Sequence, residues 1–196
     1  MDYCEPYGLV QTVAPAIEPA LWTDVASSSK TWSRDPNDDG QTVIDLLITA
    51  AREKVEIWTN RQLITATWAL TLDKFPSWEI QLPSKAPWIA ISSVVYVDGD
   101  GASQTMAAAD YRFHAATGRL TPAYGDVWPA TRSQTGTATI TFTAGYGTDA
   151  ADVPAGIRLA ILATVLDWLE NRALRFELPP GVKSQLLEFQ HGRLWG

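Results

Sequence analysis

Cysteine and histidine are nearly absent from this sequence of 196 residues. Cys4 is the one cysteine, and His114 and His191 are the two histidines. A single thiol excludes an intrachain disulfide and a zinc site made of several cysteines. Neither histidine accompanies a nucleophile motif, a second metal-binding histidine or a glycine-rich phosphate loop. The sequence therefore predicts no enzyme, no cofactor and no metal, although a pair of catalytic carboxylates among the 22 acidic residues stays open.

Charge is scarce and mostly negative. Charged residues make up 19% of the chain, and the net charge is −7. Residues 1–60 carry ten acidic and four basic side chains, whereas residues 154–196 carry four acidic and five basic ones. A protein that grips nucleic acid needs a basic stripe, and none is visible. An acidic surface repels the phosphate backbone, which is compatible with DNA that passes by without adhering.

Long apolar runs are also missing. No stretch approaches the roughly 20 apolar residues that span a bilayer. The first residues lack the basic region and apolar core of a signal peptide. We therefore expect no membrane partner and synthesis in a reducing cytoplasm.

Tryptophan, by contrast, is abundant, with nine residues in a chain that is 46% hydrophobic. Two interpretations stay open. The tryptophans either fill the core of the domain, or they leave apolar surface for contacts with other subunits.

The spacing of apolar residues predicts an α+β protein. Residues 1–20 hold three prolines and little periodicity, which indicates an extended N-terminal arm or a disordered tail. A folded domain over 21–190 and a C-terminal tail over 191–196 follow. Helical spacing and capping residues predict helices at 23–32, 36–59, 154–175 and 182–189. Alternation with a period of two predicts an antiparallel β-insert over 63–146. The expected fold is a small helical bundle with an antiparallel β-sheet inserted between the main helices.

The two long predicted helices differ in their apolar pattern. In the helix at 36–59, one face holds Val43, Leu47, Ala50 or Ala51, Val55 and Trp58. Arg52 and Glu56 form a solvated pair four residues apart. The helix at 154–175 is apolar nearly all round, so it needs neighbours on several sides.

Asp98-Gly99-Asp100-Gly101 resembles the start of a calcium loop. The further oxygen ligands and the closing glutamate of such a loop do not follow. A hairpin turn explains these residues without a metal.

An ordered set of short segments resembles the phage head–tail connector proteins, which are also called adaptor or head-completion proteins. The resemblance covers roughly residues 36–190. The segments are 48–56 (ITAAREKVE), 59–64 (TNRQLI), Trp68, 72–73 (LD), 75–76 (FP), 82–83 (LP), Pro87, 93–101 (SVVYVDGDG), 111–112 (YR), 128–129 (WP), 143–147 (TAGYG), 153–154 (VP), 168–172 (WLENR), 178–182 (LPPGV) and 186–187 (LL).

The resemblance implies a structural virion protein in the neck, between head and tail. It implies a twelvefold ring of copies of this chain, docked under the portal protein and followed by a stopper or tail-completion protein. DNA would pass through the lumen without specific binding. The family carries no cofactor and is not enzymatic.

The expected interface lies in the C-terminal third. The helix at 154–175 needs apolar neighbours, which a ring supplies, and segment 182–196 is expected to reach into the portal. Arg172 and Arg175 are either solvated or in salt bridges between subunits, and Trp195 either packs on its own domain or anchors the tail in a partner. The candidate residues are Ile157, Ile161, Trp168, Arg172, Arg175, Leu186, Leu187, Phe189, Leu194 and Trp195.

Other functions compete with this one. A stopper or tail terminator is another neck ring, but such proteins are usually smaller and mostly β. A carboxylate-based enzyme is a second alternative. A DNA-binding module is disfavoured by the missing basic patch.

Overall fold

The computed structural model describes residues 8–28, 40–171 and 177–191. Contacts divide the chain into two compact units. The sheet unit combines Met1–Ala14 with Thr65–Gly145, and the helical unit combines Pro15–Ile64 with Tyr146–Gly196. The expected arm-and-domain boundaries differ from this division, because residues 15–20 belong to the helical unit and residues 8–13 form a strand.

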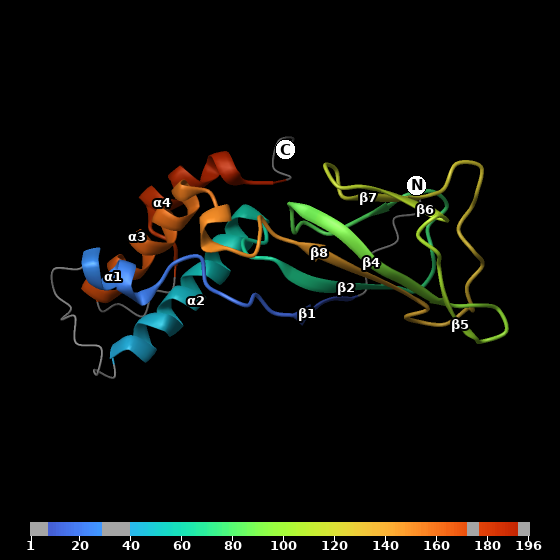
Figure 1. The fold of residues 1–196 in the computed structure, drawn as a ribbon, viewed down its shortest axis with the longest axis horizontal. Coiled ribbons are helices and arrows are strands. Elements are labelled where there is room, and N and C mark those ends of the chain that lie inside the picture. Colours follow the sequence, from blue (N-terminus) through green and yellow to red (C-terminus); the bar gives the residue numbers. More distant parts are fainter. Residues whose placement is uncertain (1–7, 29–39, 172–176, 192–196) are drawn as a thin grey trace. The chain divides into compact units, whose positions relative to one another are not determined.

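The sheet unit contains two antiparallel sheets (Figure 1). The larger has the order β1-β2-β8-β4-β5, and the smaller has the order β3-β7-β6. The strands are β1 (Gly8–Val13), β2 (Ala66–Leu72), β3 (Ile80–Gln81), β4 (Trp88–Val97), β5 (Ser103–Thr105), β6 (Tyr111–His114), β7 (Arg119–Pro122) and β8 (Ala138–Ala144).

Strand β8 lies at the centre of the larger sheet, between β2 and β4. Its sequence alternates strictly, so that Ala138, Ile140, Phe142 and Ala144 are fully buried while threonines occupy the other face. Strand β1 pairs with β2 from Gly8 opposite Thr71, and it forms one edge of the sheet. Residues 8–13 are therefore paired within the chain's own sheet.

The helical unit is built around a pair of long helices. Its elements are α1 (Trp22–Ser28), α2 (Gly40–Thr59), η1 (Ala150–Asp152), α3 (Ala155–Asn171), α4 (Pro180–Gln185) and η2 (Leu186–Phe189). Helices α2 and α3 contact each other, and α1, α4 and η2 pack around them. The unit has its own core, separate from the core of the sheet unit.

The core face of α2 differs from the expected one at Val43, which is 48% exposed. Ala51 and Val55 are buried as expected, together with Ile44 and Ile48, and Leu47 and Trp58 pack against the same core. Two apolar rows run along this helix, and the spacing of apolar residues alone does not distinguish the inner row from the outer one.

The structure confirms the α+β class, with helices and two antiparallel sheets. It also confirms the turn at Asp98. The Asp98 carboxylate accepts hydrogen bonds from the backbone N–H groups of Asp100 and Ala102 and from the Gln104 side chain. The bond from Gln104 is the largest of the effects that lower the pKa of Asp98. This carboxylate is therefore engaged in its own hairpin.

Candidate interaction surface

Neither a catalytic centre nor a metal site is evident in the part of the chain that the structure describes. Over those residues, no group of three or more histidine, cysteine, aspartate or glutamate side chains is placed to hold a metal ion. Nor does any described helix combine the length and the apolar character that crossing a bilayer requires.

The strongest charge cluster lies inside the helical unit, around Arg52. Its Nε donates to Glu18 Oε2 and its Nη1 donates to Glu56 Oε2, each at 2.8 Å. Glu56 Oε1 accepts from Gln62 Nε2 at 2.8 Å and from the backbone N–H of Leu63 at 3.0 Å. The Arg52 and Glu56 side chains are only 8% and 9% exposed.

This geometry corrects the expectation of a solvated pair. Arg52 and Glu56 do pair, but they are buried because Glu18, which lies far away in sequence, covers them. Burial by itself lowers the pKa of Arg52, and the nearby carboxylates of Glu56 and Glu18 outweigh it, so the pKa is raised. The cluster holds segment 15–21 and the end of α2 in place, which is a structural role.

The C-terminal segment is tied to the end of α2. Arg61 Nε donates to the carbonyl of Phe189, and Gln190 Nε2 donates to the carbonyl of Trp58. The backbone N–H of His191 donates to the carbonyl of Thr59 at 2.9 Å. Burial, and then the Arg61 charge, lower the pKa of His191. These groups hold residues 189–191 against the end of α2.

The expected interface residues divide into three sets. Ile157, Ile161 and Leu186 are fully buried and Trp168 is 6% exposed, so these side chains fill the chain's own core. Leu187 is 57% exposed, and Phe189 is half-buried against the core. The remaining candidates, Arg172, Arg175, Leu194 and Trp195, lie outside the described residues.

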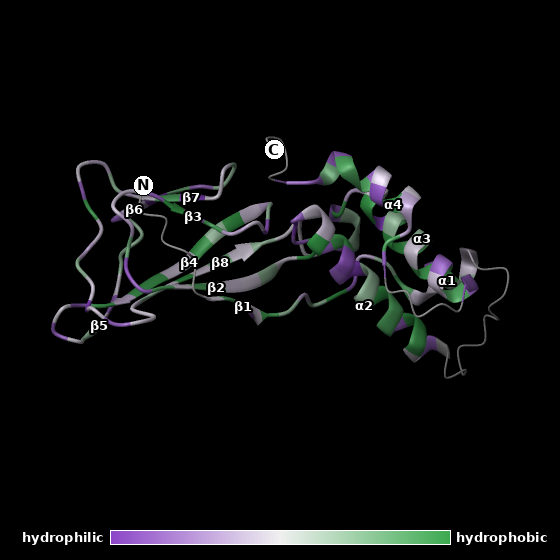
Figure 2. Ribbon diagram, turned by 180° about the vertical axis from the view of Figure 1, so that it is seen from behind, coloured by the Kyte–Doolittle hydropathy of each residue, from purple (hydrophilic) through white to green (hydrophobic). Residues whose placement is uncertain are grey.

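A row of exposed apolar side chains also lies on α2. Val43 is 48%, Leu46 66% and Ile57 68% exposed, whereas Ala50 between them packs against the unit's own core. Spacings of three and eleven residues place the three exposed side chains on one face of the helix. We call Val43, Leu46 and Ile57 the outer ridge of α2. Figure 2 shows hydrophobic residues along α2 and α3.

Sequence reasoning missed this ridge, although the signal was present. Val43 was assigned to the core face, and Leu46 and Ile57 were assigned to no face at all. A helix whose apolar residues fall into two opposite rows buries one row in its own unit. The second row therefore points to a partner.

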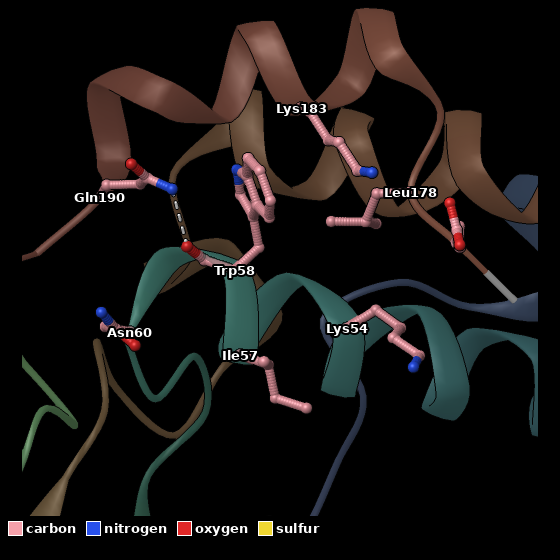
Figure 3. A pocket seen from close by; sticks show the side chains of 8 residues that line it. Lys54, Ile57, Trp58, Asn60, Leu178, Lys183 and Gln190 are labelled. Carbon is pink, nitrogen blue, oxygen red and sulfur yellow. Dashed lines mark hydrogen bonds between the residues drawn. The ribbon is translucent and has the colours of Figure 1, made fainter. Parts of the chain in front are cut away.

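A pocket of about 360 Å³ lies beside the C-terminal end of the ridge (Figure 3). Ile57, Trp58 and Leu178 give it apolar walls, and Lys54 and Lys183 are its cations. The Lys183 Nζ atom lies 5.4 Å from the centroid of the Trp58 ring. The pocket contains no nucleophile with a base, so its walls suit contact rather than catalysis.

Solved structures show that this fold is known. Three chains match over 96% of this chain, at 20–21% identity. One lies in the neck of an empty gene transfer agent (GTA) particle computed with C6 symmetry, with a TM-score of 0.78 and 98% of that chain covered. Another lies in the virion of the native GTA particle, with a TM-score of 0.75 and 97% covered. A third lies in the neck of the native particle computed with C12 symmetry, with a TM-score of 0.73 and 98% covered.

No protein-family model and no curated protein matches this sequence. The likeness therefore rests on structure, and it extends over nearly the whole of both chains. At the level of fold, it agrees with the expected resemblance to the neck proteins of phage-like particles.

Proposed function

We propose that this chain is a structural subunit of the neck of a phage-like particle, and that it is not an enzyme. The observation that carries the proposal is the fold likeness to chains of GTA particles over 96% of this chain. A likeness that spans whole chains includes both units and their order.

The finer role is that of an adaptor. Copies of the chain form a ring, twelvefold in the complete particle, between the portal protein and a stopper or tail-completion protein. The related chains come from assemblies computed with C6 and C12 symmetry, which supports a ring. The net charge of −7 supports a lumen through which DNA passes without adhering.

Deletion of the gene tests the proposal. Particles made without this chain are expected to have heads that carry no tails and lose their DNA, and the full chain supplied in trans is expected to restore both properties. Electron microscopy and a nuclease-protection assay read out the two effects. Particles that attach tails and retain DNA without this chain would refute the role.

Binding assays separate the adaptor from a stopper or terminator. An adaptor ring binds the portal directly, whereas a terminator binds the tail. Pull-down with purified portal and purified tail tubes therefore distinguishes the two roles, and binding to tails alone would favour the terminator.

A further inference from the structure

The helical unit carries two apolar faces that point away from its shared core. On α2 the outer ridge lies opposite the buried row that contains Ile48 and Val55. On α3 the buried residues include Ile157 and Ile161, whereas Leu159 is 57% exposed. Because α2 and α3 pack against each other, the faces turned away from that contact lie on opposite sides of the pair.

The two faces also differ in shape. The ridge of α2 presents three large side chains, those of Val43, Leu46 and Ile57. The outer face of α3 presents Leu159, which is 57% exposed, and the small exposed Ala155 one turn before it, whereas Ala163 packs against the unit's own core. A small residue one turn from a leucine leaves a groove into which a large side chain fits. The faces are therefore candidates to pack against each other, and in one chain they cannot meet.

A cyclic ring requires two different contact surfaces on each copy. Each copy of a head-to-tail ring presents one surface to the copy before it and a different surface to the copy after it. We infer that the outer ridge of α2 contacts the outer face of α3, around Leu159, on the next copy of this chain. The inference rests on the proposed function, because a ring, which the symmetric assemblies of the related chains support, places a second copy beside each chain.

Cross-linking inside particles tests the contact. In a Cys4→Ser background, a chain carrying both Leu46→Cys and Leu159→Cys is treated with a short bis-maleimide. We expect a ladder of covalent multimers beyond the dimer, because each copy links to two neighbours. Each single variant alone should remain monomeric, and a mixture of the two singles should stop at dimers.

The matched control is a pair of exposed apolar residues in the sheet unit. Ile89 is 46% and Val127 80% exposed. The Ile89→Cys/Val127→Cys chain should give no ladder under the same conditions. A ladder from this control, or dimers from Leu46→Cys alone, would overturn the head-to-tail contact between α2 and α3.

A second measurement does not depend on cross-linking geometry. Leu46→Glu places a charge in the ridge without touching the core, so its thermal unfolding should match that of the natural chain. Its incorporation into particles should fall at least about tenfold, as for a buried interface residue, while Val127→Glu is incorporated normally. Normal incorporation of Leu46→Glu would refute the contact. Absence of even the natural chain from particles would instead refute the proposed function.

Discussion

Arg52 shows how a charged residue comes to lie inside the helical unit. Two carboxylates, those of Glu18 and Glu56, each accept a 2.8 Å hydrogen bond from it. Glu56 in turn binds the backbone where the chain leaves α2. Such a buried cluster is stable only while its members compensate one another. It therefore fixes the geometry of α2 and the residues after it relative to Glu18, which is distant in sequence.

Removal of the cation should destabilise the protein strongly. Arg52→Ala leaves two carboxylates without their cation, and we expect the free energy of unfolding to fall by about 3–5 kcal/mol. The control is Glu53→Gln, because the Glu53 side chain is 62% exposed and lies 3.9 Å from Arg52. That change should cost less than about 1 kcal/mol. Urea denaturation measures both, and equal losses would contradict a special role for the buried cluster.

At Gly118, both the backbone conformation and a neighbouring ring require glycine. Its φ is +65°, and a Cβ there would lie 2.7 Å from the Trp88 ring, which is buried. Gly118→Ala combines a left-handed backbone with overpacking, so we expect a loss of about 2–4 kcal/mol in unfolding free energy. Gly125 has a φ of +88° with nothing within 4 Å of the added atom. Gly125→Ala should therefore cost only about 1–2 kcal/mol, and thermal or urea unfolding compares the two variants.

At the scale of elements, we expect substitutions on the two faces of α3 to change the free energy of unfolding by different amounts. Ile161 is fully buried, and Ile161→Ala should lower the free energy of unfolding by about 2–5 kcal/mol. Leu159 is 57% exposed, and Leu159→Ala should change it by no more than about 0.5 kcal/mol. Urea denaturation of the isolated chain measures both. A large loss from Leu159→Ala would mean that this face is packed within the chain.

The elements also show what a sequence can predict. Strand β8 was predictable because its alternation is strict and local. The buried face of α2 was predicted wrongly at Val43 because two apolar rows compete on that helix. Arg52 is paired inside the unit with Glu18, which is distant in sequence. A local sequence pattern therefore does not predict the burial of Arg52. For the candidate interface, the sequence predicted that α3 is apolar nearly all round. The side of α3 that faces outward depends on tertiary packing, so the sequence did not predict it.

At the scale of the whole molecule, charge decides how the chain meets DNA. A net charge of −7 opposes approach to the phosphate backbone. We expect no saturable binding to a labelled DNA duplex at micromolar protein and about 0.15 M salt, as measured by fluorescence anisotropy. Binding that weakens steeply with added salt would contradict this and would revive a nucleic-acid-binding role.

The division of the chain has a consequence for its synthesis. Every strand among the described residues lies between Gly8 and Ala144, so all of these strands leave the ribosome before α3 does. The helical core, in contrast, joins Ile48 to Ile157, which lie on either side of most of the strands. Domains complete their folding as units during translation. A nascent chain that stops after Ala144 therefore carries a finished sheet unit and an α2 with both apolar rows uncovered, which makes that helix the natural target of a chaperone.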